Sequence, residues 1–336
     1  GSYVIGKNYV GGIVGRNNDN VVLKNCINNG VVAGYEKYIG GIVGYNESAT
    51  IEDCASYLSD YNRKIFDMVV NQWQTTGDYV GGIAGYNNGE ITFSEASEAI
   101  TVKSVSSLVA GKNYIGGIVG FNDVDGTLDV HYTLIGGRIY ATGDCVGGAF
   151  GFNASTSVLT KSLTVKPGSV EGRYYVGGVI GANVVDLTSN TTMDQFKADN
   201  TLGKITGQAY VGGVIGYQRT YTHKQAGLAS NAALQSVIQS GNIRLLPGLS
   251  DGNIPASAEA SKNSYTLTVT TQGNDASSLA VAINNIPVSA DVYSGGVIGY
   301  CEKSSKLLIE NCRNAGNMIK RSDDKEVSLY NYLCSA

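Results

Sequence analysis

The chain repeats one seven-residue phrase eight times, and this repetition constrains its fold more than any other feature. The phrase is Tyr-Val-Gly-Gly-Ile-Val-Gly at 9–15, Tyr-Ile-Gly-Gly-Ile-Val-Gly at 38–44, and in its last copy Tyr-Ser-Gly-Gly-Val-Ile-Gly at 293–299. A catalytic motif needs only one copy, so a phrase that recurs along a chain first indicates architecture. The sequence therefore predicts a repeat protein.

The positions of the copies give the length of the repeat. The double glycines lie at 11–12, 40–41, 81–82, 116–117, 147–148, 177–178, 212–213 and 295–296. Successive copies are 29, 41, 35, 31, 30, 35 and 83 residues apart. A unit close to the shortest spacing, lengthened in places by insertions, explains this series.

Each unit is expected to hold three short strands bounded by turn residues. The first ends in glycine, as in Gly-Val-Val-Ala-Gly at 30–34, the second is the phrase, and the third alternates polar and apolar residues, as in Thr-Ile-Glu-Asp-Cys at 50–54. Such a unit cannot bury its apolar face alone, so it must stack on its neighbours. We predict an all-β fold, a right-handed parallel β-helix of about eight rungs that is on the order of 40 Å long.

Departures from the period define the expected organisation. Residues 1–217 are predicted to be β-helix repeats with a side insertion near 57–76, residues 218–290 an irregular insertion or subdomain, and residues 291–336 the final repeat and a C-terminal segment. Within the large insertion we expect a helix around 224–240 and a strand pair near 264–271 and 279–288. Neither end shows a cap, so we expect flanking domains of a larger chain.

Amide side chains follow the phrase in register. They are Asn17, Asn46, Asn87, Asn122, Asn153 and Asn183, with Gln218 and Cys301 at the same place in the last two units. In stacked coils such residues form a ladder of hydrogen bonds between neighbouring rungs. We expect a structural role for this ladder.

Aromatic residues form two further columns. The first position of the phrase holds Tyr9, Tyr38, Tyr79, Tyr114, Cys145, Tyr175, Tyr210 and Tyr293, and its end holds Tyr45, Tyr86, Phe121, Phe152, Tyr217 and Tyr300. Ladders that face solvent would offer rings to a sugar or a protein, whereas buried ladders would only stabilise the coil. Both alternatives stay open at this point.

The sequence gives no support for a metal or a cofactor. Cys26 and Cys54 occupy matching places in adjacent units, which favours a thiol ladder, although a disulfide between them is conceivable. The chain has no Cys-x-x-Cys and only two histidines. Residues 122–126 lack the ligand pattern of an EF-hand, so we expect a plain turn there.

Charge and hydropathy narrow the classes of partner. The net charge is -4, and no cluster of lysines and arginines is interleaved with aromatic residues, so nucleic acid is not an expected partner. No apolar run approaches the roughly 20 residues of a membrane span. We expect no membrane span in this chain.

The combined pattern of the units resembles the GLUG-motif repeat family. It is carried by Tyr-Val-Gly-Gly-Ile-Val-Gly, by Thr-Ile-Glu-Asp-Cys at 50–54 and by Leu-Ile-Glu-Asn-Cys at 308–312. This resemblance implies a setting in secreted or cell-surface bacterial proteins, including adhesin-like proteins and the non-catalytic regions of IgA-cleaving metallopeptidases. The chain has no His-Glu-x-x-His, so it does not match the zinc site of those peptidases.

These observations favour a non-catalytic adhesin-like or spacer module at the cell surface or outside the cell. The expected partners are a host glycan or an extracellular protein, which exposed aromatic residues of the insertions would contact. The candidates are Trp73, Tyr57, Tyr61, Tyr221 and Tyr265.

The alternative function is a polysaccharide-degrading enzyme on a β-helix scaffold. Such chemistry needs a pair or a cluster of carboxylates on one face. The acidic residues Asp53, Asp78, Asp129, Asp144 and Asp186 occupy different positions in their units. They are therefore not expected to converge on a catalytic site.

Overall fold

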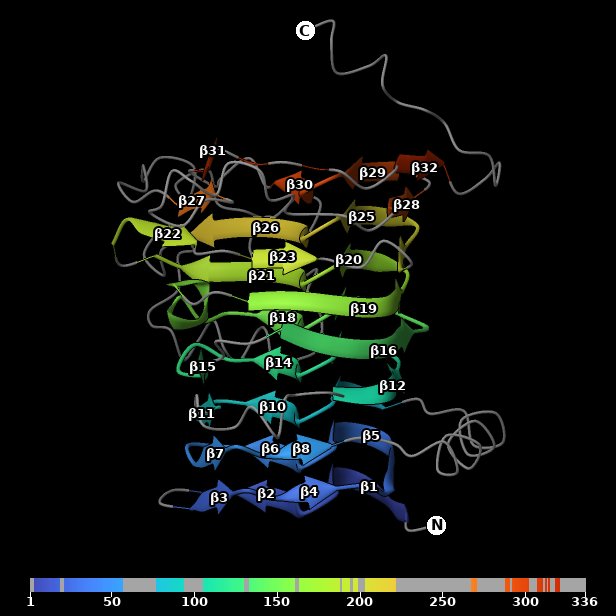
Figure 1. The fold of residues 1–336 in the computed structure, drawn as a ribbon, viewed down its shortest axis with the longest axis vertical. Coiled ribbons are helices and arrows are strands. Elements are labelled where there is room, and N and C mark those ends of the chain that lie inside the picture. Colours follow the sequence, from blue (N-terminus) through green and yellow to red (C-terminus); the bar gives the residue numbers. More distant parts are fainter. Residues whose placement is uncertain are drawn as a thin grey trace, which may run out of the picture.

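The structure, a computed structural model, describes most of the repeat region. The described residues are 3–18, 21–56, 77–93, 105–129, 133–160, 163–187, 189–193, 196–198, 203–221, 267–270, 288–290, 292–301, 307–310, 312, 314 and 318–320. They form a stack of β-coils that rises from the N-terminal to the C-terminal end (Figure 1). Their one non-strand element is the 3₁₀ turn η2 (Ser157–Thr160), and none of them belongs to a helix that could cross a membrane.

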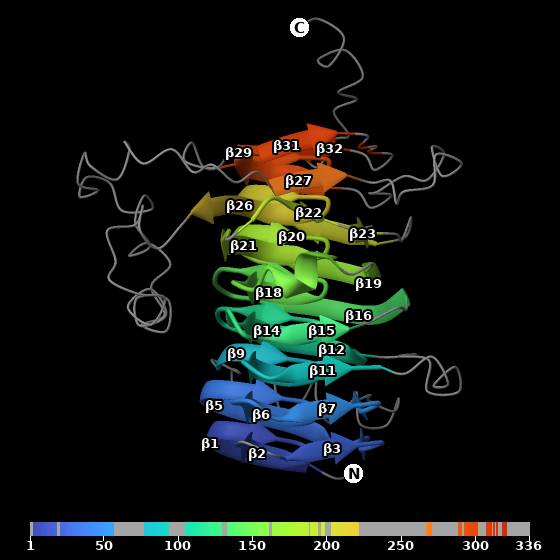
Figure 2. The ribbon, with the colours of Figure 1, turned by 90° about the vertical axis from the view of Figure 1, so that its left-hand side faces the viewer.

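Two eight-stranded sheets run the length of the stack. The first sheet consists of β1 (Tyr3–Gly11), β5 (Val31–Gly40), β9 (Asp78–Gly81), β13 (Ile115–Gly116), β17 (Val146–Gly147), β20 (Tyr174–Gly177), β25 (Ala209–Gly212) and β29 (Val292–Gly295). The second sheet consists of β2 (Val14–Asn17), β6 (Val43–Asn46), β10 (Ala84–Asn87), β14 (Val119–Asn122), β18 (Phe150–Asn153), β21 (Ile180–Asp186), β26 (Ile215–Tyr221) and β30 (Ile298–Cys301). Neighbouring strands are parallel and one coil apart, which confirms a parallel β-helix (Figure 2).

Further sheets close the coils. The third sheet contains β12 (Val105–Gly111), β16 (Thr133–Ala141), β19 (Leu163–Glu171), β24 (Lys204–Thr206), β28 (Val288–Ala290) and β32 (Met318–Lys320), with β23 (Phe196–Ala198) beside β19. The remaining strands are β3 (Val22–Lys24), β7 (Thr50–Glu52), β11 (Glu90–Thr92) and β15 (Thr127–Asp129), then β22 (Thr191–Met193), β27 (Leu267–Thr270) and β31 (Leu307–Glu310), and the pair β4 (Ile27–Asn28) and β8 (Ala55–Ser56).

The repeated phrase is two strands and not one, so the expectation of three strands per unit is wrong. Its first arm belongs to the first sheet and its second arm to the second sheet, and the chain turns between them at the double glycine. A Cβ on Gly40 would lie 1.8 Å from the carbonyl oxygen of Val43, and one on Gly41 would lie 2.1 Å from that of Gly82. Only glycine fits at this bend, because any side chain would overlap the backbone.

The last glycine of the phrase lets its two arms pack together. A Cβ on Gly44 would lie 2.5 Å from the oxygen of Gly15 and 2.6 Å from the oxygen of Tyr38. Tyr38 itself has a φ of 64°, and the residue at its place is left-handed in all eight copies. A bulky residue in this region costs about 1–2 kcal/mol, so the packing around each phrase must hold it there.

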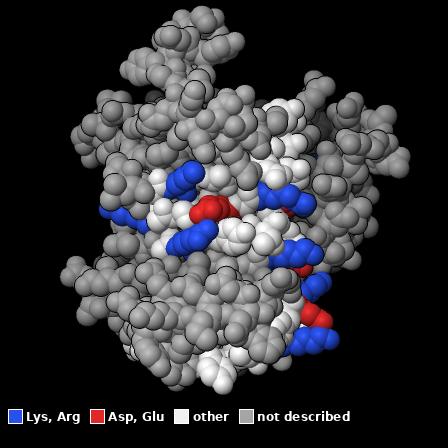
Figure 3. All heavy atoms as spheres, turned by 90° about the vertical axis from the view of Figure 1, so that its right-hand side faces the viewer, with Lys and Arg blue, Asp and Glu red and all other residues white. Residues whose placement is uncertain are grey.

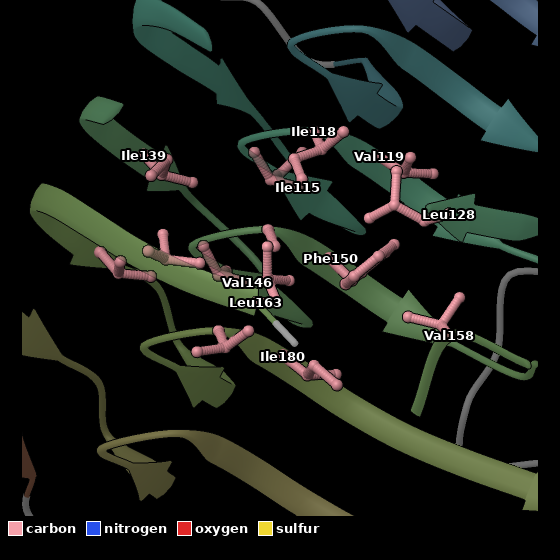
Figure 4. Packing of buried hydrophobic residues seen from close by; sticks show 14 of the residues in the cluster. Ile115, Ile118, Val119, Leu128, Ile139, Val146, Phe150, Val158, Leu163 and Ile180 are labelled. Atoms are coloured by element: carbon pink, nitrogen blue, oxygen red, sulfur yellow. The ribbon is translucent and has the colours of Figure 1, made fainter. Parts of the chain in front are cut away.

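One continuous hydrophobic core fills the inside of the stack. It extends from Val10 in the first coil to Ala290 in the third sheet. Figure 4 shows Ile115, Ile118, Phe150 and their neighbours, which come from successive coils and pack inside the stack. Since each coil covers the apolar face of the next, no single unit could form this core alone.

Part of the predicted insertion at 218–290 belongs to the β-helix. β27 lies between β22 and β31, whereas β28 lies between β24 and β32 of the third sheet. β27 falls within the first strand of the expected pair, near 264–271, and belongs to the β-helix. Nearly all of the second, near 279–288, lies outside the described residues, so the pairing of the two stays a prediction. The expected helix around 224–240 lies outside the described residues.

The predicted amide ladder is confirmed from Asn46 to Gln218. Each Nδ2 donates to the side-chain oxygen of the next coil at 2.7–3.0 Å, through Asn46, Asn87, Asn122, Asn153, Asn183 and Gln218. In the middle coils the same nitrogen also donates to a nearby backbone carbonyl, for example that of Gly126. The ladder does not include Asn17, whose buried amide has no hydrogen-bond partner.

Of the two alternatives for Cys26 and Cys54, the structure has the thiols and not the disulfide. Cys26 and Cys54 are free, and the backbone N–H of Cys26 donates to the Cys54 sulfur at 3.4 Å. Burial raises the pKa of Cys54 to about 12. The thiol therefore stays neutral at physiological pH and acts as a small packed side chain.

Substitution of Gly44 by alanine tests the close packing of the two arms. We expect Gly44→Ala to destabilise the protein by at least about 2 kcal/mol, because its methyl group would overlap two backbone oxygens. Gly168→Ala is the matched control, since its Cβ would lie 3.3 Å from the nearest atom, the Gly137 oxygen, and we expect a clearly smaller loss of stability there. Equal shifts of the denaturant midpoint in the two variants would contradict this account.

Substitution within the amide ladder tests its contribution to stability. Asn122→Leu removes a donor to Asn153 and an acceptor for Asn87, and we expect a loss of about 3 kcal/mol from the stranded buried groups. Asn17→Leu should be neutral or stabilising, because no bond of the Asn17 amide is lost. Urea unfolding of both variants gives the comparison, and a greater loss for Asn17→Leu would refute it.

Candidate functional site

Most of the candidate site residues lie outside the described part of the chain. Tyr57, Tyr61, Trp73 and Tyr265 belong to segments that the structure does not describe. Tyr221 is the last residue of β26, and its backbone pairs with Asp186 of β21. Ligand binding by these five residues therefore stays a prediction.

The two aromatic ladders form a second hydrophobic cluster. Along the first, ring centroids of consecutive coils are 5.1 Å apart for Tyr9 and Tyr38, 5.0 Å for Tyr38 and Tyr79, and 4.8 Å for Tyr79 and Tyr114. Rings of the second ladder meet the first edge to face, as Tyr45 meets Tyr38 at 5.0 Å. These geometries are the favourable ones for aromatic pairs.

The ladders are buried in the middle of the stack. Tyr79 and Tyr217 are at most 1% exposed, whereas Tyr9 and Tyr293 in the end coils are 42% and 54% exposed. Burial raises the pKa of Tyr38 to about 12, so this phenol is neutral at physiological pH. Of the two alternatives for the ladders, stabilisation of the coil is confirmed for these middle coils.

The acidic residues considered for catalysis are distributed over different strands and coils. Asp78 begins β9, Asp129 ends β15 and Asp186 ends β21, while Asp53 and Asp144 lie in connections between strands. Among the described residues, no three His, Cys, Asp or Glu side chains gather closely enough to bind a metal ion. The turn at 123–126 is closed by a hydrogen bond from Gly126 to the Asp123 carbonyl, and the Asp123 carboxylate accepts from the Tyr86 hydroxyl.

A second polar ladder, which the sequence reasoning missed, follows the corner between the third and the first sheet. Asp78 accepts hydrogen bonds from the backbone and side-chain nitrogens of Asn113, at 3.1 and 2.9 Å. The Asn113 side-chain oxygen in turn accepts from the backbone of Asp144 at 2.9 Å. Desolvation raises the pKa of Asp78, because burial penalises its charged form.

Arg173 continues this corner ladder. Its Nε and Nη2 donate to the two carboxylate oxygens of Asp144 at 2.8 and 2.9 Å, and its guanidinium lies 5.0 Å from the centre of the Tyr174 ring. The backbone of Arg173 is bonded on both sides, to Gly143 and to Gln208. The side chain is therefore held in one orientation at a surface position.

A shallow cavity of about 250 Å³ lies at this corner, and we call it the corner depression. Its lining residues are Tyr140, Ala141, Thr142, Glu171, Gly172, Arg173, Thr206 and Gln208. At its edge Arg138 forms an ion pair with Glu171 at 3.2 Å and lies 5.2 Å from the centre of the Tyr140 ring. Figure 3 views this side of the molecule, where basic side chains of the described residues surround acidic ones.

The corner depression arises where the repeat departs from its own pattern. The strand register places Ala110, Tyr140, Glu171 and Thr206 in one column, so large side chains in two coils interrupt a column of smaller ones. Aligning the strand before each phrase, as well as the phrase itself, would have revealed this change.

The comparisons with known proteins agree with the repeat pattern. Residues 35–56 match the family model described as the GLUG motif. They comprise part of β5, all of β6, β7 and β8, and so one copy of the bent phrase with its following strands. The comparisons with curated proteins and with solved structures found no match. The seven other copies share the phrase and the left-handed residue that opens it, so the GLUG motif at 35–56 is one of eight similar units in this chain.

Proposed function

We propose that this chain is a non-catalytic, elongated module of a larger bacterial secreted or cell-surface protein. It would hold its neighbouring domains apart or present a binding surface to a host glycan or an extracellular protein. The proposal rests on one observation: polar side chains of this chain form contacts between neighbouring coils. Buried amides bond along the ladder, and surface charges form pairs such as Lys24 with Glu52 and Arg16 with Glu47.

This pattern supports a scaffold role, because carboxylates that could serve in catalysis instead form ion pairs between coils. Glu47 and Glu52 in the second coil pair with cations of the first, and Asp144 holds Arg173. A glycoside hydrolase needs two carboxylates about 5–9.5 Å apart that face one substrate. Each of these three carboxylates instead faces a positive charge of the neighbouring coil.

The extracellular setting is proposed from the GLUG motif. Within that setting, contact with a partner is assigned to five aromatic residues. They are Tyr57, Tyr61, Trp73 and Tyr265, which lie in the predicted insertions, and Tyr221, which ends β26. Aromatic residues dominate the binding energy of many interfaces, because they remove a large area from water at a small cost in entropy.

Binding is tested on arrays of glycans and extracellular-matrix proteins. Where the wild type binds, we expect Trp73→Ala to weaken binding by about 2 kcal/mol or more, roughly thirtyfold. Tyr3→Ala is the control, since Tyr3 is 63% exposed in the first coil and belongs to neither insertion. Binding that survives the loss of all five aromatic residues would move the site to the regular coils, and no binding at all would leave the spacer role.

Catalysis is tested separately with a broad panel of polysaccharides. We expect no new reducing ends and no unsaturated products after long incubation with the purified chain. Depolymerisation of any polysaccharide would favour the alternative enzyme. An Asp144→Asn variant would then show whether the carboxylate paired with Arg173 takes part.

A further inference from the structure

The corner depression has the size of a site for one small ring. Its volume of about 250 Å³ lies below the range of about 300–1,000 Å³ that is typical of pockets for drug-sized ligands. It opens on the outer side of the stack, next to strands of the third sheet that are fixed by parallel pairing in neighbouring coils. A single unit of a longer ligand could therefore enter it while the rest of that ligand lies along the surface.

Its lining combines one aromatic ring with planar hydrogen-bonding groups. Tyr140 supplies the ring, and Glu171, Arg173 and Gln208 supply a carboxylate, a guanidinium and an amide. Arg173 has further N–H donors and Glu171 further lone pairs besides those used in their ion pairs, and the Gln208 amide can donate and accept, which suits the hydroxyl groups of a sugar. The ring suits the apolar C–H face of the same sugar.

The charges of the depression are already balanced within the protein. Arg173 is paired with Asp144 at 2.8 Å, and Glu171 is paired with Arg138 at 3.2 Å. An anionic ligand would have to compete with Asp144 for the guanidinium, and a cationic ligand with Arg138 for the carboxylate. A neutral ligand can accept and donate hydrogen bonds without breaking either pair.

The site is also preorganised. Arg173 is held by Asp144, by Tyr174 and by its backbone bonds to Gly143 and Gln208. Arg173 and Glu171, which are already held in ion pairs, would lose little freedom when a ligand binds, and this lowers the entropic cost of association. This rigidity distinguishes the corner from an ordinary patch of exposed charges.

From these features we propose that the corner depression binds one neutral hexose unit of a glycan, with the Tyr140 ring against the sugar and Glu171, Arg173 and Gln208 bonded to its hydroxyl groups. The inference rests on the proposed binding function and deepens it, because it adds a site on the regular coils to the one assigned to the insertions. The site is shallow, so its affinity for a single sugar is expected to be about millimolar.

The test is saturation-transfer NMR and titration of the whole chain with glucose, galactose, N-acetylglucosamine and glucuronate. We expect transfer to at least one neutral sugar and a loss of affinity of about tenfold or more in Tyr140→Ala. Tyr140→Phe should keep most of the affinity, because the ring remains. Tyr3→Ala should bind like the wild type, and thermal unfolding should confirm that each variant is folded.

The outcomes separate this inference from the proposed function. Binding of neutral sugars that is unchanged in Tyr140→Ala would overturn the corner site and leave binding through the insertions intact. Binding of glucuronate alone would contradict the proposal that the ligand is neutral. The absence of saturation transfer to any of the sugars would contradict the corner site itself. If Tyr140→Ala does not fold, the exposed Gln208→Ala replaces it, and unchanged affinity in that folded variant would equally reject the proposal.

Discussion

The structure depends on a close approach between two backbone segments that only glycine permits. In each phrase the chain bends at the double glycine, and its second arm returns against the first at a third glycine. Around Gly44 the space for a Cβ is occupied by backbone oxygens of its own coil and of the coil before. Because these glycines have no side chain, the two backbone segments can approach closely. This approach sets the distance between the first and the second sheet, and the strand register follows from that distance.

This packing explains why a strained conformation is kept in every coil. The residue that opens the phrase is left-handed at all eight positions, although seven of them are tyrosines. Stacking of each ring on its neighbours and burial between the sheets offset that backbone cost. The aromatic ladders therefore help to hold the bend, and their burial removes them as a binding surface in the middle coils.

Most features that recur in register could be predicted from the sequence, whereas features that depart from the repeat could not. The fold class, the amide ladder and the thiols at Cys26 and Cys54 follow from residues that recur in register, so the spacing was enough to predict them. The division of the phrase into two strands was not predicted, because glycines within a strand and glycines at a corner leave the same pattern of letters. The corner depression was missed for the opposite reason, since Tyr140 and Arg173 are exceptions within their columns and alignment on the phrase hides them.

The amide ladder has a direction. Every side-chain nitrogen donates toward the coil that follows, so an unpaired acceptor remains on Asn46 and an unpaired donor on Gln218. The amide dipoles consequently add along the axis, and each bond polarises the next. Each coil accepts on one side of the ladder and donates on the other. If a whole coil were removed from the middle, the two coils on either side of the gap could therefore form the same hydrogen bond with each other. Gain or loss of complete repeats would thus change the length of the rod while preserving the bonding along its axis, a route by which related proteins could differ in reach.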